Sequence, residues 1–125
     1  METTVDELRA LADAGATILN VGARGGRREI RGAVRYRPHD LLTPERLAIP
    51  LASDKPVVLY DEDGAGDLTS RIADKLRAEG FADVRVLGGG FAAWERAGGV
   101  TQESSIEQVV PPMSSSEVQA LDRRI

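Results

Sequence analysis

The chain has 125 residues, of which 42% are hydrophobic and 29% charged, as in an ordinary globular domain and unlike a disordered segment. Its net charge of −4, without a long basic stripe, predicts no nucleic-acid partner, and the lack of cysteine excludes disulfides and every thiol mechanism within the chain. The sequence has neither an apolar run of about 18 residues nor a hydrophobic leader, so we expect a cytoplasmic protein that does not enter a membrane.

The N-terminal segment is predicted to form a short helix over residues 4–14. Thr4 fits the N-cap position, Glu7 stands three residues later as in a capping box, and Gly15 suits the end of the helix. The apolar run 16–21 that follows predicts a strand covered on both faces.

Loops alternate with short elements in the next part of the chain. The stretch 22–28, rich in glycine and arginine, is interpreted as a solvated loop in preference to an anion-binding patch, and residues 33–36 form a second candidate strand. Thr43 as N-cap and Pro44 at the first helical position predict a short helix within residues 41–49. The sole histidine, His39, is expected in the loop before that helix, as a surface residue.

A strand, a loop and a helix follow. Residues 57–60, with the sequence VVLY, are the most strand-like tetrad of the chain and lead into the acidic, glycine-containing loop 61–68. A helix is predicted over residues 69–79, with Thr69 near its start and Gly80 at its end.

The pattern ends with a strand at residues 84–87, a glycine turn at 88–90 and a helix at 91–97. Helices that alternate with short buried strands predict an α/β fold. We expect a parallel sheet of about 4–5 short strands, flanked by helices on both faces.

The composition changes after the last predicted helix. Residues 1–100 are expected to form the domain, and residues 101–116, rich in Ser, Gln and Glu, to form a linker. Residues 117–125 are predicted to form a short helix that repeats the cap, glutamate and apolar order of the first helix. We interpret it as the opening of a second copy of the same domain. A helix packed back on the first domain and a frayed tail are the alternatives.

Several motifs occur in one order along the second half of the chain: the strand VVLY, Asp61 with its loop, a capped helix that ends in Gly80-Phe81, the segment VRVLGGG, and Phe91-Ala92-Ala93-Trp94. Together they resemble the rhodanese, or thiosulfate sulfurtransferase, family. In that family the strand runs into a catalytic cysteine, and a tight loop with inward-pointing N–H groups follows. Residues 19–21 and 30–34 also match the family pattern, so the resemblance covers roughly residues 3–100 and implies a rhodanese-like domain.

The resemblance places Asp61 at the position of the catalytic cysteine. Sulfur transfer needs a thiolate that carries the sulfur as a persulfide, and a carboxylate cannot do so. We therefore expect a non-catalytic module with a structural, regulatory or protein-interaction role, no cofactor and no metal. The resemblance implies a protein partner or a tandem rhodanese domain. The degenerate active-site loop comprises Asp61, Glu62, Asp63, Gly64, Ala65, Gly66, Asp67, Leu68 and Thr69.

Other departures from the family pattern surround Asp61. The loop holds four carboxylates, which should repel anionic substrates, and counted to Thr69 it is about two residues longer than in the family. Asn20 and Gly22 replace an acid and a frequent arginine, which removes a buried ion pair. We expect the Asp61 carboxylate to accept the N–H groups of the loop, as a built-in anion that locks it.

Two other interpretations of the acidic loop remain. The order of Asp61 and Asp63 after an apolar strand resembles the nucleophile motif of haloacid-dehalogenase-type phosphatases, which implies Mg²⁺-dependent phosphate hydrolysis as the alternative function. The same acids resemble part of a calcium loop, but Ala65 and Ile72 stand where two ligands are needed. A solvated turn is preferred to a dedicated metal site.

Overall fold

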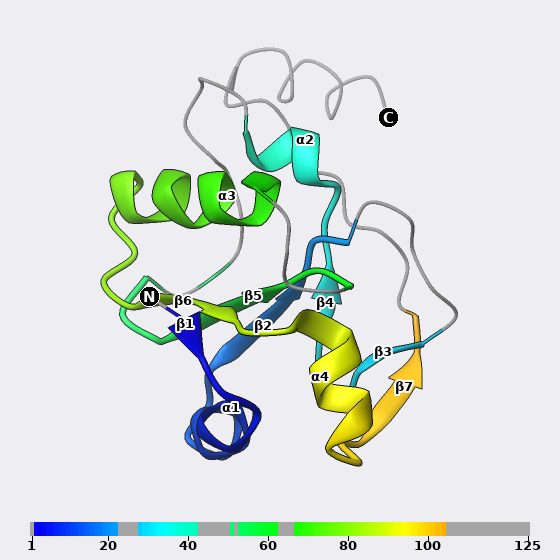
Figure 1. The fold of residues 1–125 in the computed structure, drawn as a ribbon. Coiled ribbons are helices and arrows are strands. Elements are labelled where there is room, and N and C mark those ends of the chain that lie inside the picture. The colour runs from blue at the N-terminus through cyan, green and yellow to red at the C-terminus, as the bar shows by residue number, and fades with distance from the viewer. Residues whose placement is uncertain (1, 23–27, 43–50, 52, 63–66, 105–125) are drawn as a thin grey trace, which may run out of the picture.

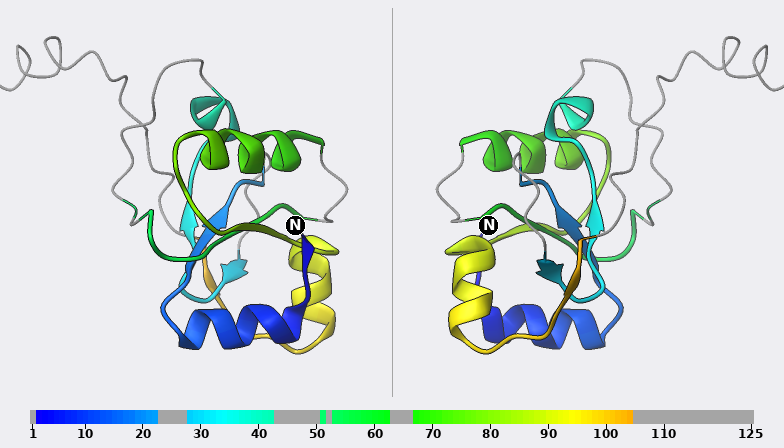
Figure 2. Two further views of the ribbon diagram at one scale, coloured as in Figure 1. Left: turned by 90° about the vertical axis from the view of Figure 1, so that its left-hand side faces the viewer. Right: turned by 90° about the vertical axis from the view of Figure 1, so that its right-hand side faces the viewer.

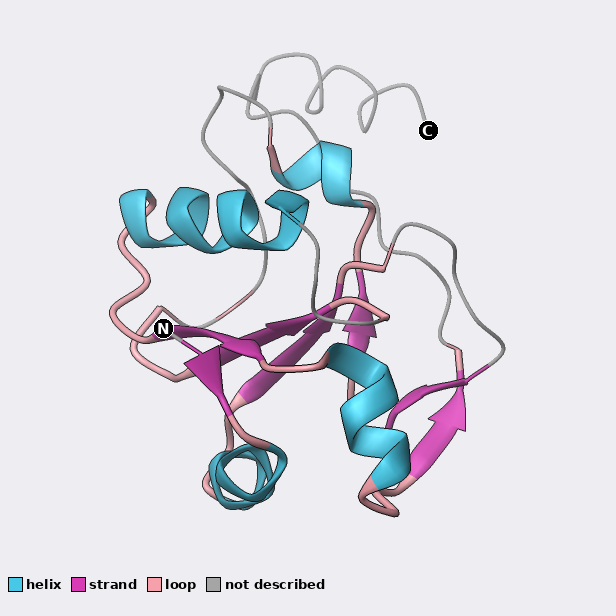
Figure 3. Cartoon of the chain, in the orientation of Figure 1, coloured by secondary structure: helices cyan, strands magenta, loops and turns pink. Residues whose placement is uncertain are grey.

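The computed structural model describes residues 2–22, 28–42, 51, 53–62 and 67–104. Five strands form one parallel sheet in the order β1-β6-β5-β2-β4 (Figures 1 and 3). Their bounds are β1 Glu2–Thr3, β2 Thr17–Asn20, β4 Val34–Arg35, β5 Val57–Tyr60 and β6 Val84–Leu87. Two further strands, β3 (Arg28–Ile30) and β7 (Thr101–Glu103), form a small antiparallel sheet. The predicted parallel α/β fold is confirmed.

Helices cover both faces of the large sheet. Helices α2 (Pro38–Leu41) and α3 (Asp67–Ala78) lie on one face, and α1 (Val5–Asp13) and α4 (Gly90–Arg96) lie on the other (Figures 1 and 2). The small sheet lies beside α4 (Figure 1).

The central strand β5 divides the core into two clusters. Successive side chains of a strand point to opposite faces of its sheet. Val57 and Leu59 therefore pack toward α2 and α3, whereas Val58 and Tyr60 pack toward α1 and α4. The first cluster also includes Leu19, Leu41, Ile72, Leu76 and Phe81, and the second also includes Leu8, Ile18, Ile30, Leu87 and Trp94.

The first predicted helix is confirmed with its cap. The Thr4 hydroxyl accepts a hydrogen bond from the Glu7 amide (3.2 Å), and the Glu7 carboxylate accepts one from the Thr4 amide (3.2 Å). Gly15, which follows the helix, has a φ of 94°, in the left-handed region that favours glycine.

The structure differs from the sequence-based expectations in two helices. Helix α2 begins at Pro38 and contains His39, which was expected in a loop. Of the helix predicted within residues 41–49, residues 43–49 lie outside the described residues. Pro38 stands at the first position of α2, so it carries the same signal that was assigned to Pro44 in the sequence. Helix α3 begins at Asp67, two residues before Thr69, so Thr69 lies inside the helix.

Three strands of two or three residues, β1, β3 and β7, were not predicted, because such short segments show no measurable periodicity. Strand β7 lies in the segment expected to be a linker, so the sheet pairing extends past the expected domain boundary at residue 100. Residues 105–125, which include the rest of that segment and the predicted terminal helix, lie outside the described residues.

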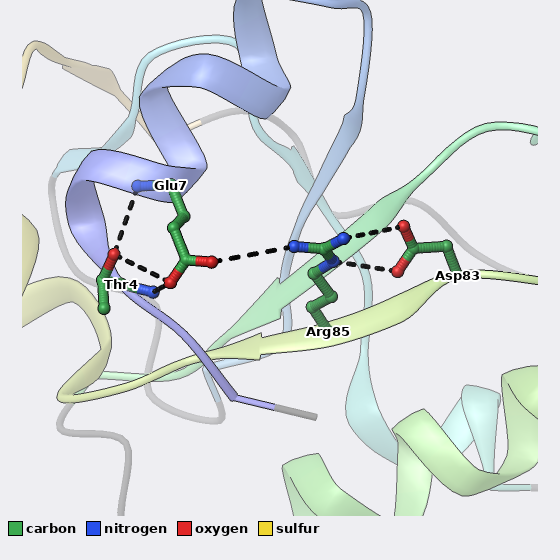
Figure 4. A network of polar contacts seen from close by, with 4 residues as sticks. All are labelled: Thr4, Glu7, Asp83 and Arg85. Carbon is green, nitrogen blue, oxygen red and sulfur yellow. Dashed lines mark hydrogen bonds and ion pairs between the residues drawn. The ribbon is translucent and has the colours of Figure 1, made fainter.

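A polar network joins the start of α1 to strand β6 (Figure 4). Arg85 forms two hydrogen bonds to the Asp83 carboxylate, at 2.9 and 3.1 Å, and lies 4.0 Å from Glu7. The hydrogen bonds and charge of Arg85 lower the pKa of Asp83 below its ordinary value of 3.8. Strand β1 pairs only with Val86 and Leu87 of β6, so Arg85 lies on the part of β6 that β1 does not cover. Charged side chains at such an edge oppose pairing with another chain.

We predict that this network stabilises the fold in a pH-dependent way. Because the pKa of Asp83 is lower in the folded state, its contribution is present above pH 3.8 and is lost as the pH falls through the lowered value. Arg85→Gln should therefore lower the free energy of unfolding near pH 5 by about 0.2–1 kcal/mol, since the pair is partly exposed to solvent. Urea unfolding should show a smaller loss near pH 3. In the background of Asp83→Asn the effect should be the same at both pH values, and a loss that grows on acidification would contradict the prediction.

Candidate functional site

The candidate site lies at the carboxyl ends of the parallel strands, where open α/β sheets commonly bind ligands. Strand β5 ends at Tyr60, and its neighbour β2 ends in register at Asn20. Asp61 and Glu62 directly follow β5, and Gly22 follows β2. A Cβ atom added at Gly22 would lie 3.7 Å from Cγ of Glu62, so the two segments are adjacent.

The backbone of Asp61 and Glu62 is fixed by the start of α4. The Phe91 amide donates to the Asp61 carbonyl (2.8 Å), and the Ala92 amide donates to the Glu62 carbonyl (2.9 Å). The first amides of a helix have no partner within it, so these two carbonyls satisfy donors of α4. The position of the Asp61 backbone therefore depends on the helix on one face of the sheet.

The side chain of Asp61 contacts the helix on the other face. Its Oδ2 accepts a hydrogen bond of 2.7 Å from the hydroxyl of Thr69, which is buried within the first turn of α3. A carboxylate near the N-terminus of a helix is favoured by the helix dipole. Asp61 thus links α3 to the end of β5.

The structure brings together only part of the loop predicted from the sequence. Asp61, Glu62, Asp67, Leu68 and Thr69 are described, and the last three belong to α3. The connection between β5 and α3 is thus shorter than the count to Thr69 indicated. Residues 63–66 (Asp63, Gly64, Ala65 and Gly66) lie outside the described residues, as do the N–H groups expected to bind Asp61 there.

A buried polar group beneath the site was not predicted. Glu29 of β3 is completely buried, and its Oε1 accepts a hydrogen bond of 3.2 Å from the Asn20 side chain. The Asn20 Oδ1 accepts another of 3.0 Å from the Gly22 amide. An amide–carboxylate pair therefore involves Asn20, where the sequence indicated only the loss of an ion pair. Glu29 follows two arginines, and nothing in the local pattern marks it as buried.

Tyr60 lies next to this group and is neutral. Burial raises the pKa of the Tyr60 hydroxyl well above its ordinary value, and the negative charge of Glu29 raises it further, against the opposing effect of a hydrogen bond from the Ile30 amide (3.0 Å). The ring of Tyr60 stacks on Phe91, with 6.3 Å between centroids. Tyr60 thus belongs to the core, as the sequence indicated.

The other singled-out side chains serve the core or the surface. Trp94 packs in the cluster beneath α1 and α4, donates its indole N–H to the Val100 carbonyl (2.9 Å), and has the Arg9 guanidinium 5.6 Å from its ring centroid. His39 is exposed on α2.

The chemistry that the described groups offer is limited. Asp61 supplies a carboxylate, Thr69 a buried hydroxyl, and the whole sequence has no thiol. Within the part of the chain that the structure describes, no three His, Cys, Asp or Glu side chains are grouped as metal ligands, and no helix has the length and apolar character needed to cross a membrane.

The chain is similar in sequence and in fold to several known proteins. The chain is 36% identical over 77 residues to the 3-mercaptopyruvate sulfurtransferase of Escherichia coli strain K12; the match covers 56% of the chain and 26% of that enzyme. Among solved structures, the Alr3790 protein from Anabaena sp. matches with a TM-score of 0.65 and 28% identity, over 95% of this chain and 99% of that one. The thiosulfate sulfurtransferase from Pseudomonas aeruginosa matches with a TM-score of 0.66 and 25% identity, over 82% of this chain and 20% of that one.

The chain therefore spans about a quarter of the curated enzyme that it matches. The sequence profile of the rhodanese-like domain matches residues 4–97, which is most of the chain. Among the described elements, this range contains strands β2, β4, β5 and β6 of the large sheet and helices α1 to α4. On this match and on the shared fold, the chain belongs to the rhodanese-like domain family.

Proposed function

We propose that this domain is a non-catalytic rhodanese-like module with a structural, regulatory or protein-interaction role, within a sulfurtransferase-type or other multidomain protein. The observation that carries the proposal is Asp61, whose carboxylate follows strand β5 and is hydrogen-bonded to Thr69 at the start of α3. The family resemblance puts the sulfur-carrying cysteine at this position.

The chemistry of sulfur transfer supports the proposal. The step requires a nucleophilic thiolate that binds the transferred sulfur and then releases it to an acceptor. A carboxylate oxygen cannot store sulfur in this way, and the chain has no cysteine that could act instead. The Asp61 carboxylate instead accepts a hydrogen bond from the Thr69 hydroxyl, which is a structural contact.

The charge around Asp61 gives further support. Glu62 and Asp67 are described acidic residues of the loop sequence that contains Asp61, and both are exposed. Carboxylates at this spacing repel an approaching anion such as thiosulfate or 3-mercaptopyruvate. The same groups are suited to contact a basic surface of a protein partner.

The length of the relatives supports a role beside another domain. The match covers 26% of the E. coli enzyme and 20% of the P. aeruginosa enzyme, so each of these two relatives extends well beyond the matched part. We propose a protein partner or a tandem rhodanese domain as the contact of this module. The interpretation of residues 117–125 as the opening of a second copy is part of the same proposal.

We predict no sulfur transfer by this chain. With thiosulfate and cyanide, or with 3-mercaptopyruvate and a thiol acceptor, the rate should equal that of a reaction without protein, because no residue can form a persulfide. The E. coli 3-mercaptopyruvate sulfurtransferase is the positive control. A rate above background that Asp61→Ala abolishes would overturn the proposal.

A phosphatase assay separates this proposal from Mg²⁺-dependent phosphate hydrolysis. We expect no turnover of para-nitrophenyl phosphate with or without Mg²⁺, because Asp61 is engaged by Thr69 and the loop repels the anionic substrate. Turnover that needs Mg²⁺ and disappears in Asp61→Asn would instead assign the loop to phosphate chemistry.

The structural role of Asp61 has its own test. Asp61→Ala leaves the buried Thr69 hydroxyl without this acceptor and should lower the free energy of unfolding by about 1–3 kcal/mol. Asp61→Asn keeps an acceptor oxygen but removes the charge, so it should lose a smaller part. In a double-mutant cycle with Thr69→Val, the coupling should be about 1 kcal/mol or more. Ser70→Ala removes an exposed hydroxyl one residue later and is the control. A coupling near zero, measured by chemical denaturation, would contradict the role.

A further inference from the structure

The buried carboxylate of Glu29 joins two parts of the chain that are far apart in sequence. Its Oε1 accepts from the side chain of Asn20, at the end of β2, and its Oε2 accepts from Nε2 of Gln102, in the middle of β7, at 2.7 Å. Burying a carboxylate is costly unless donors surround it. The position of β7 is therefore tied to the hydrogen bonding of this one carboxylate.

Gln102 is held by more than this bond. Its Nε2 also lies 3.3 Å from the Ala33 carbonyl, and its Oε1 accepts from the Gly32 amide at 2.9 Å. The backbone of β7 pairs with β3, with Gln102 opposite Glu29, and the preceding Val100 carbonyl accepts from the Arg31 amide at 3.1 Å. Strand β7 thus supplies Glu29 with a donor on one carboxylate oxygen, while Asn20 supplies a donor on the other.

The other end of the connection reaches the site. Asn20 Oδ1 accepts from the Gly22 amide, and Gly22 lies against Glu62, the residue after Asp61. A continuous series of hydrogen bonds therefore runs from Gln102 through Glu29 and Asn20 to the backbone at Gly22. Each link is between groups within 3.2 Å.

We propose that the attachment of β7 controls the position of Gly22, and of Glu62 beside it, through Gln102, Glu29 and Asn20. We call β7 in this role the clasp. When β7 is displaced, Glu29 loses the donor of its 2.7 Å bond. The Asn20 side chain then moves closer to the Glu29 carboxylate, and its hydrogen bond with the Gly22 amide lengthens or breaks. A partner that displaces β7 would therefore act on Gly22 through this series of hydrogen bonds. This inference does not depend on whether the loop is catalytic.

The test exchanges the two polar groups. Gln102→Glu places a second carboxylate against Glu29, which removes the donor and adds repulsion. Combined with Glu29→Gln, the double variant restores one amide donor and one carboxylate acceptor in reversed order. Amide hydrogen exchange followed by NMR reports on Gly22 directly, and on the carbonyls of Asp61 and Glu62 through the amides of Phe91 and Ala92.

We expect exchange at Gly22 to be about tenfold faster or more in Gln102→Glu, and to return to within about threefold of the native rate in the double variant. Amides in the middle of β5 should exchange at nearly unchanged rates, since the effect is local. Acceleration at Gly22 that equals the acceleration in β5 would reduce the clasp to a contribution to global stability and would overturn the proposal.

Two further variants keep the test decisive. Gln102→Met removes the donor without adding a charge, so it tests the link between β7 and Gly22 if Gln102→Glu does not fold. An unchanged exchange rate at Gly22 in Gln102→Met overturns the proposal.

Arg28→Met is the control variant. It removes the bonds from the Arg28 side chain to Thr101 on the exposed side of β7, at 2.7 and 2.9 Å, and leaves Gln102 in place. It should speed exchange in the β3–β7 pairing, and it should speed exchange at Gly22 much less than Gln102→Met does, because Gln102 keeps its bond to Glu29. Equal acceleration at Gly22 in Arg28→Met would show that the polar series is not the route.

Discussion

Complete burial of strand β5 is the constraint on which the rest of the structure depends. All four of its residues are at most 2% exposed, and they alternate between the two core clusters. A shift of the strand by one residue would move every side chain to the wrong cluster, so the register with β2 and β6 is fixed. The point at which β5 ends, and hence the position of Asp61, follows from this packing.

Asp61 is hydrogen-bonded to helices on both faces of the sheet. Its carbonyl satisfies an amide of α4 on one face, and its side chain satisfies the Thr69 hydroxyl of α3 on the other. The Asp61 carboxylate is therefore integrated into the fold between the end of β5 and the start of α3. A carboxylate at this position is compatible with the rhodanese-like architecture, because its hydrogen bond with Thr69 ties the start of α3 to the end of β5.

The periodic elements could be predicted from the sequence, and the polar core could not. The buried tetrad at β5, the capping box at Thr4 and the glycines that follow helices are local signals, and each matches the structure. Strands β3 and β7 form only because they meet each other, over 70 residues apart in sequence. The burial of Glu29 depends on that meeting, so no pattern around Glu29 could reveal it. The bond between Thr69 and Asp61 likewise requires knowing that α3 begins at Asp67.

The route of the chain after α4 bears on where this domain ends. A Cβ atom at Gly99 would overlap the Trp94 ring, and the Trp94 indole holds the Val100 carbonyl, so the backbone leaves the helix in one fixed direction toward β3. The family profile stops at residue 97, before this route begins. A fragment cut at that profile boundary would keep the four described helices and the described parallel sheet, yet it would expose the edge of β3 and leave Glu29 without Gln102. Domain limits taken from sequence similarity alone would thus omit the segment that completes this core.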